Sequence, residues 1–161
     1  MDRRRSTGLA LATAATIVLF AAAIAGVGTA SARTSVDLRA GVYTGASGLA
    51  IGGGLVGELH RGSSWLFNPN LEIVFPGGGN VFTMNGDFHY EFPSAGSVGG
   101  YAGVGPAILI SSPDVGNSHT DFGVNLIAGI IGLRGHTHPF AQAKGVLSNN
   151  SEFVLMGGVR F

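Results

Sequence analysis

The stretch from Ser151 to Phe161 reads SEFVLMGGVRF, and its alternation of residue types decides the fold. Every second residue counted back from the end belongs to one set, which is apolar throughout: Phe161, Val159, Gly157, Leu155 and Phe153. The other set carries a charge near each end, at Glu152 and Arg160. Because successive side chains of a strand point to opposite faces, the stretch predicts a strand with one apolar face. A soluble sandwich would turn this face inward, whereas a membrane barrel would turn it toward lipid.

The composition limits the classes of protein that need consideration. The chain of 161 residues is long enough for one domain, with 11% charged residues and 28 glycines. Its formal net charge of zero gives no electrostatic support for binding nucleic acid. The sequence contains no cysteine, which excludes disulfides, thiolate catalysis and cysteine-ligated metals.

The N-terminal region has the three parts of a secretory signal peptide. Arg3, Arg4 and Arg5 form a positive segment, residues 9–27 are apolar, and Ala30-Ser31-Ala32 is an A-x-A cleavage site. We therefore expect residues 1–32 to be a signal peptide and residues 33–161 to be the mature domain. An uncleaved membrane anchor is the alternative, because the apolar run is nearly long enough to span a bilayer. The mature chain has six basic and eight acidic residues, so it is mildly acidic.

The mature chain shows alternation and recurring turns in place of helical periodicity. The clearest segment runs from Phe82 to Phe92 and alternates aromatic or apolar residues with polar ones. Turn clusters such as residues 76–80 and 93–97 divide the chain into eight such segments. Pro69 lies inside one of them and cannot donate to a ladder, so we expect a bulge or an unpaired position there. An even number of strands with short connections predicts an all-β, antiparallel, up-and-down barrel whose termini lie on one side.

The placement of charges indicates which face of the strands is inside. The loops carry few charges, whereas the polar faces of the strands carry many, so the sequence predicts an interior polar network. Its members are Asp37, Arg39, Glu58, Glu72, Asp87, Glu91, Asp121, Lys144, Glu152 and Arg160. An eight-stranded barrel has an interior that side chains can fill, which favours an ion-paired plug over an open channel. A narrow water-filled conduit is the functional alternative.

The aromatic residues of the apolar faces fall near the strand ends. If the strands run alternately up and down, these residues form two levels, as in the aromatic girdles of a membrane barrel. The predicted girdle residues are Trp65, Phe67, Phe75, Phe82, Tyr90, Phe92, Phe122, Phe153 and Phe161. The alternative interpretation is that they form the core of a soluble barrel, which would not require two separate levels.

The mature chain, residues 33–161, resembles the small eight-stranded outer-membrane β-barrel family, of the OmpA/OmpX/OmpW-like type. The resemblance rests on the signal peptide, on YAGVGP at residues 101–106 and on GGVRF at residues 157–161. It implies a transmembrane β-barrel in the outer membrane of a Gram-negative envelope, reached by export through the inner membrane. It also implies that Phe161 is the signal by which the barrel assembly machinery recognises the C-terminal strand. The short loops depart from the family, whose outer loops are usually longer, which argues against an adhesion or receptor role.

Catalytic and metal chemistry have little support in the sequence. The candidate bases are five histidines: His60, His89, His119, His136 and His138. The resemblance to lipid A deacylases would require a histidine placed beside a serine nucleophile on the outward rim. Ser148 and Ser151 have no nearby histidine in sequence, and Asp87 and His89 lack an adjacent serine. The His136-x-His138 pair in a turn is a weak metal signature. The sequence therefore predicts no catalytic residues, no metal and no cofactor.

These observations predict a monomeric integral outer-membrane protein with a structural role in the envelope and no catalytic activity. Its predicted partners are outer-membrane lipid and the barrel assembly machinery, and not nucleic acid. Two alternatives stay open. One is a narrow channel or transporter for small solutes or hydrophobic molecules, and the other is a soluble periplasmic barrel that binds an apolar ligand.

Overall fold

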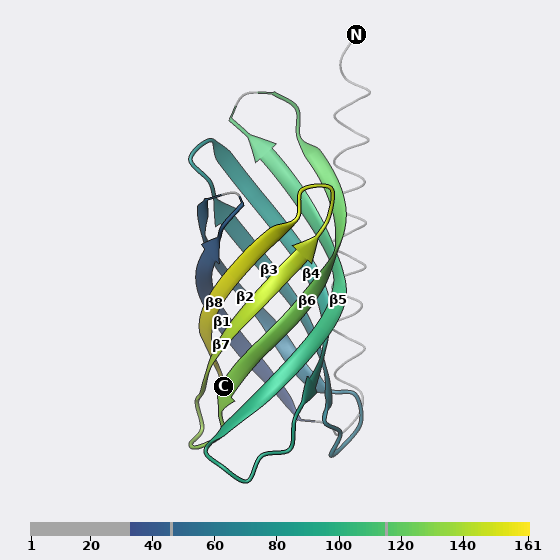
Figure 1. Ribbon diagram of the computed structural model, residues 1–161, viewed down its shortest axis with the longest axis vertical. Coiled ribbons are helices and arrows are strands. Elements are labelled where there is room, and N and C mark those ends of the chain that lie inside the picture. The colour runs from purple at the N-terminus through teal and green to yellow at the C-terminus, as the bar shows by residue number, and fades with distance from the viewer. Residues whose placement is uncertain (1–32, 46, 115) are drawn as a thin grey trace.

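The computed structural model describes residues 33–45, 47–114 and 116–161, which form eight strands (Figure 1). The predicted signal peptide, residues 1–32, lies outside the described residues. No helix in the described part of the chain is long and apolar enough to cross a membrane. The strands are β1 (Thr34–Tyr43), β2 (Gly48–Glu58), β3 (Trp65–Phe75), β4 (Gly79–Glu91), β5 (Val98–Pro113), β6 (His119–Gly132), β7 (His138–Leu147) and β8 (Glu152–Arg160).

Each strand pairs antiparallel with the next, and β1 pairs with β8, so the sheet closes into a barrel with tilted strands (Figure 1). The closing register aligns Asp37 near the start of β1 with Arg160 at the end of β8. Both ends of the described chain therefore lie at one end of the barrel, which we call the terminal end. The opposite end is the distal end. The prediction of an eight-stranded antiparallel barrel is confirmed.

The barrel is apolar outside and polar inside, and neighbouring residues show the contrast directly. Leu71 is 47% exposed whereas Glu72 is 1% exposed, and Leu38 is 54% exposed whereas Asp37 is 1% exposed. The same alternation runs along all strands, because a side-chain period of two sends adjacent residues to opposite faces. Many large apolar side chains thus cover the outer wall, and charged groups such as Asp37 and Glu72 are buried.

Pro69 and Pro106 interrupt hydrogen bonding without shifting the strand register. The β2–β3 pairing resumes in the same register beyond Pro69, so this position is unpaired toward β2, is not bulged, and stays paired with Gly86 on β4. The register places Leu55 opposite Pro69, whose nitrogen has no hydrogen to donate. The Leu55 carbonyl accepts instead from Asn68 Nδ2 at 2.8 Å. A side-chain amide from the preceding residue thus replaces the missing backbone donor.

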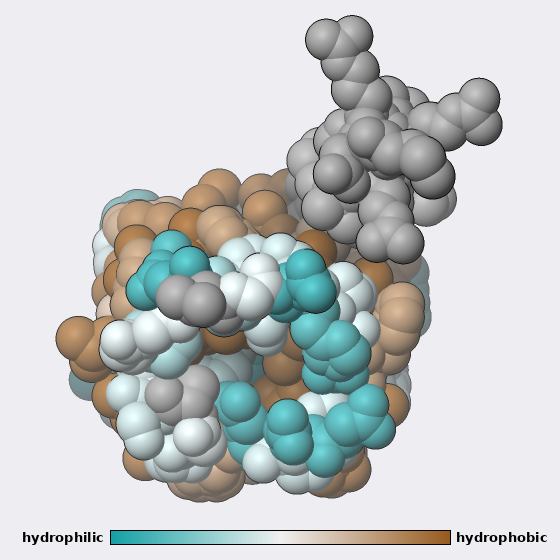
Figure 2. Space-filling model, turned by 90° about the horizontal axis from the view of Figure 1, so that it is seen from above, coloured by the Kyte–Doolittle hydropathy of each residue, from teal (hydrophilic) through white to brown (hydrophobic). Residues whose placement is uncertain are grey.

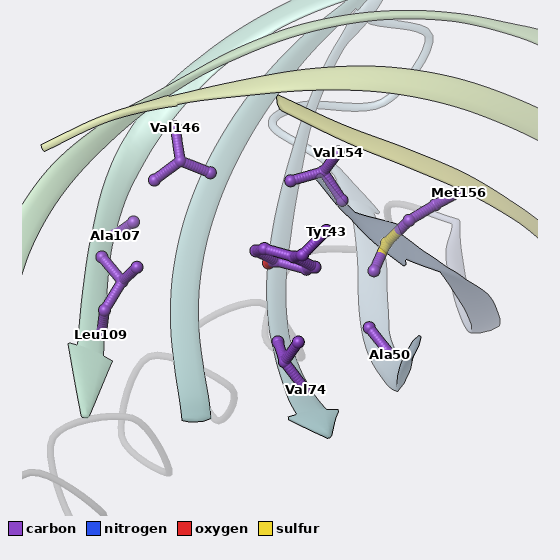
Figure 3. Packing of buried hydrophobic residues seen from close by; sticks show 8 residues of the cluster. All are labelled: Tyr43, Ala50, Val74, Ala107, Leu109, Val146, Val154 and Met156. Atoms are coloured by element: carbon purple, nitrogen blue, oxygen red, sulfur yellow. The ribbon is translucent and has the colours of Figure 1, made fainter. Parts of the chain in front are cut away.

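Two apolar clusters lie inside the barrel at different heights. The distal cluster surrounds Tyr43 (Figure 3) and consists of Tyr43, Ala50, Val74, Ala107, Leu109, Val146, Val154 and Met156. The second cluster, in the terminal half, consists of Tyr101, Ile127, Ile131 and Phe140. Figure 2 looks onto the distal end, where hydrophilic residues surround a hollow and apolar residues cover the outer wall. Most of the buried polar side chains lie between the two clusters.

Candidate functional site

The candidate site is the polar interior, which we define as Asp37, Arg39, Asn68, Asn70, Glu72, Thr83, Asn85, Asp87, Asn125 and Lys144. All ten residues are buried, and they come from five strands, β1, β3, β4, β6 and β7. Their charged members are three carboxylates and two cations. Because burial removes charges from water, each needs a partner inside the barrel.

Arg39 and Asp37 form the first ion pair, two residues apart on β1. Arg39 Nε donates to Asp37 Oδ1 at 2.9 Å, and Arg39 Nη2 donates to Asp37 Oδ2 at 2.6 Å. Asn68 on β3 joins both groups, because its Oδ1 accepts from Arg39 at 2.8 Å and its Nδ2 donates to Asp37 at 2.9 Å. The two-point contact fixes the orientation of the guanidinium group. Arg39 also lies over the Phe140 ring, 5.8 Å from its centroid.

Glu72 and Lys144 form the second ion pair, across the barrel from β3 to β7. Lys144 Nζ donates to both carboxylate oxygens of Glu72, at 2.9 and 2.7 Å. The Tyr43 hydroxyl also donates to Glu72 Oε2. Arg39 Nη1 lies 3.6 Å from Glu72 Oε1, so Glu72 connects the two ion pairs electrostatically. Two cations and two carboxylates therefore form one compact group.

Asp87 is held by amides in place of a cation. Asn70 Nδ2 and Asn125 Nδ2 each donate to one oxygen of this carboxylate at 2.8 Å. Asn85 links the two asparagines, because it donates to Asn70 Oδ1 and accepts from Asn125, both at 2.9 Å. These four residues thus bind β3, β4 and β6 together across the interior.

The other predicted interior residues lie toward the barrel ends and do not join this group. Arg160 Nη1 donates to Glu91 Oε1 at 2.7 Å at the terminal end. Glu58 Oε2, at the same end, accepts from the backbone nitrogen of Gly62 at 2.9 Å. Asp121 at the distal end accepts from Asn149 at 3.0 Å and contacts His119 at 3.1 Å. Glu152 is half-buried at the start of β8.

The residues predicted to form aromatic girdles all lie on the outer wall or its edge. Trp65, Phe75, Phe82, Phe92, Phe122, Phe153 and Phe161 are exposed, and Phe67 and Tyr90 are half-buried. At the terminal end, Tyr90 lies 5.2 Å from Trp65 and 5.4 Å from Phe92 between ring centroids. The predicted girdle residues toward the distal ends of the strands are all phenylalanine: Phe75, Phe82, Phe122 and Phe153.

Sequence reasoning missed the uncharged members of the interior, because it counted only charged residues. Asn68 donates to Asp37, Asn70 and Asn125 donate to Asp87, and Asn85 links Asn70 with Asn125. Tyr101 and Gln142 are likewise buried, and Tyr101 donates to Gln142 Oε1 at 3.0 Å. The signal was present in the alternation, which assigns these residues to the same strand faces as the charges.

His89 is the buried histidine among the described residues. It is 2% exposed, its ring nitrogens contact no hydrogen-bonding group of the described chain, and its ring packs 5.3 Å from that of Tyr101. His138 Nδ1 contacts the Gly132 carbonyl at 2.8 Å. The described residues contain no group of three or more His, Asp or Glu side chains arranged to hold a metal ion.

No protein-family model matches the sequence, and no curated protein is significantly similar to it. Its fold is similar to that of solved outer-membrane structures, of which two illustrate the likeness. The N-terminal β-barrel domain of Pseudomonas aeruginosa OprF is similar with a TM-score of 0.68 and 15% identity, over 80% of this chain and 95% of that one. Neisserial surface protein A is similar with a TM-score of 0.64 and 16% identity, over 79% of this chain and 94% of that one.

The chain has the fold of the small outer-membrane β-barrels. The resemblance drawn from the sequence is thus confirmed at the level of the fold. An outer-membrane barrel of this size has an interior that side chains fill, and here the two ion pairs and the asparagines fill it. The observed alternation, with apolar residues outside and polar residues inside, is the pattern of such barrels.

Proposed function

We propose that this protein is an integral outer-membrane barrel with a structural role in the envelope and a non-catalytic, side-chain-filled interior. The observation that carries the proposal is the reversed distribution of side chains. Charged residues such as Lys144 and Asp87 are 0% exposed, whereas Phe122 is 73% exposed on the outer wall. In water this arrangement would expose a large apolar surface, and in lipid the same surface is favourable.

The connected polar interior supports a structural role. The hydrogen bonds of Glu72 and Asp87 reach β1, β3, β4, β6 and β7, so the interior ties together strands that are far apart around the barrel. Removing one member leaves a buried charge or amide unpaired, which costs more than the contact itself contributes. Such a network favours a single rigid barrel.

A channel function has weaker support. The distal cluster around Tyr43 lies across the interior, and its residues are between 0% and 8% exposed. A hydrated ion would have to pass this apolar layer, which is unfavourable without a rearrangement. We therefore expect no steady conductance in planar bilayers. A stable conductance that changes when Lys144 is replaced would favour the channel alternative.

A soluble periplasmic barrel would need the opposite distribution of side chains. Such a protein encloses its ligand with apolar side chains and shows its charges to water. Here Asp37, Arg39 and Lys144 are buried, and Leu49 is 68% exposed. This alternative predicts a protein that stays soluble without detergent.

The proposal includes the barrel assembly machinery as a partner, through the C-terminal strand. β8 ends at Arg160 and is followed by Phe161, which is 56% exposed at the edge of the terminal end. Replacing Phe161 with alanine keeps the hydrogen bond from its backbone nitrogen to the Val36 carbonyl at 2.9 Å. A fall in outer-membrane assembly without a loss of stability would therefore support recognition of the Phe161 side chain. Equal assembly of this variant and the wild-type protein would contradict it.

The decisive experiment is cell fractionation followed by gel electrophoresis with and without boiling. We expect the protein in the outer-membrane fraction, with different mobility before and after heating, because a closed barrel resists detergent until heat unfolds it. A detergent-free, soluble protein with unchanged mobility would contradict the proposal.

A further inference from the structure

The exposed charges of the barrel differ in sign between its two ends. Arg33, Arg61 and Arg134 are exposed at the terminal end, and their side chains make no ion pair or hydrogen bond with any described residue. The acidic residues at the distal end are Asp114, Asp121 and Glu152, and the described residues there include no lysine or arginine. The unpaired positive charges are therefore confined to one rim.

The acidic residues of the terminal end do not neutralise these arginines. Glu91 is paired with Arg160 at 2.7 Å. Glu58 accepts a hydrogen bond from the backbone nitrogen of Gly62 and so closes the β2–β3 turn. Both carboxylates are thus engaged within the fold, and the three arginines keep their charges available for a partner.

The three arginines are distributed around the barrel. Arg33 precedes β1, Arg61 lies in the β2–β3 turn, and Arg134 lies in the β6–β7 turn. A small soluble ligand contacts one side of a rim. A membrane leaflet surrounds the barrel and meets all sides at one height, so the arrangement fits a leaflet better than a compact ligand.

The aromatic residues mark the same end of the outer wall. Trp65 and Tyr90 face each other across β3 and β4, and Phe92 packs against Tyr90. The amphipathic rings of tryptophan and tyrosine favour the headgroup level of a bilayer.

The β2–β3 turn holds Arg61 just beyond this aromatic group. Leu59 N donates to the Trp65 carbonyl at 3.0 Å, and Ser63 N donates to the His60 carbonyl at 3.0 Å. These bonds and the Glu58–Gly62 contact fix the turn, and Arg61 is exposed on it.

We infer that the terminal rim is a binding surface for anionic phospholipid headgroups, with Arg61 beside Trp65 and Tyr90 as its main contact and Arg33 and Arg134 extending it around the barrel. This inference rests on the proposed insertion into a membrane. A cation near an anionic bilayer surface gains enough free energy to raise the local affinity about fivefold. The acidic distal rim offers no such contact, so the surface also orients the barrel toward an anionic leaflet.

The test reconstitutes the protein in phosphatidylcholine bilayers that contain spin-labelled phosphatidylglycerol or spin-labelled phosphatidylcholine. Electron spin resonance then measures the motionally restricted lipid at the barrel surface and gives the selectivity for the anionic lipid. We expect a selectivity above one. In the triple variant Arg33→Gln, Arg61→Gln, Arg134→Gln it should fall toward one, and in Arg61→Gln alone it should fall part of the way.

A matched control separates local contacts from net charge. The variant Asn117→Glu, Ser118→Glu, Asn150→Glu changes three exposed distal residues and shifts the net charge by the same amount and sign. We expect it to keep the wild-type selectivity. Equal losses in both triple variants would overturn the inference, because net charge alone would then explain the effect.

Failure of the inference is distinguishable from failure of the proposed function. If a restricted lipid component is present but the wild-type selectivity is one, the barrel is inserted and only the headgroup surface is wrong. If no restricted lipid appears with either label, membrane insertion itself fails. Purified peptidoglycan tests another partner for the rim. If the protein binds it through the three arginines and the lipid selectivity is one, the rim binds the wall polymer and the lipid proposal is overturned.

Discussion

Lys144 on β7 donates to both carboxylate oxygens of Glu72 on β3, although the two residues are 72 positions apart in the sequence. Both side chains are 0% exposed. The Tyr43 hydroxyl also donates to this carboxylate, and Arg39 Nη1 lies near it. Glu72 therefore connects the Lys144–Glu72 ion pair with the Arg39–Asp37 ion pair.

Replacing Glu72 with glutamine should destabilise the barrel strongly. The change leaves Lys144 buried without its counter-charge, and we expect the free energy of unfolding to fall by about 3 to 5 kcal/mol. Urea unfolding in phospholipid vesicles, followed by tryptophan fluorescence, measures this difference. Glu58→Gln at the half-buried terminal rim is the control, with an expected loss below about 1 kcal/mol.

The double variant Glu72→Gln, Lys144→Met tests the cause of that loss. Removing both charges should restore most of the stability, because an uncharged interior no longer contains an unpaired ammonium group. If the double variant is less stable than Glu72→Gln alone, charge pairing is not the reason for the loss.

Replacing Asn68 with alanine should destabilise the barrel, because Pro69 cannot donate to the Leu55 carbonyl in its place. The change removes the donor to the Leu55 carbonyl and one partner of Arg39, and each group left unpaired costs about 1 to 3 kcal/mol. Adding Pro69→Ala should recover part of the loss, because alanine supplies the backbone N–H that proline lacks. The same vesicle unfolding experiment measures both variants, and an absence of recovery would count against this role of Asn68.

Gly129→Ala should disturb the interior in the terminal half. A Cβ at this position would lie 2.7 Å from Tyr101 Cε1, so the ring has to move. Overpacking of this kind costs about 1 to 3 kcal/mol. Gly145→Ala is the control, because a Cβ there meets no atom within 4 Å. The folded fraction on unboiled gels should fall for the first variant and stay unchanged for the second.

The single tryptophan reports the position of the terminal end relative to lipid. Trp65 is 46% exposed on the outer wall, so quenchers attached to lipids should reach it when the barrel is inserted. We expect stronger quenching by labels near the headgroup than by labels near the bilayer centre, because Trp65 lies at the start of β3. Stronger quenching from the centre would contradict the girdle assignment.

Much of the fold follows from the sequence because alternation is local information. The final segment and the segment from Phe82 to Phe92 predict strands with one apolar face, and the even number of segments predicts a closed up-and-down barrel. The same alternation assigns Asp37, Glu72, Asp87 and Lys144 to one face, and these side chains lie inside the barrel. Pro69 was expected to leave a bulge or an unpaired position, and the structure has the unpaired position.

The choice of partners inside the barrel depends on tertiary structure alone. The sequence does not indicate that Lys144 meets Glu72 or that asparagine amides hold Asp87, because these contacts depend on the register of strands far apart in the chain. Nor does it indicate that Tyr43 lies in an apolar cluster above the ion pairs.

By itself, the sequence determined which side chains face in and which face out, because a strand fixes this for each residue through its period of two. Only the closed barrel decided which inward side chains meet. Closure brings β1 against β8 and sets strand tilt and register together, and these set the distances across the interior.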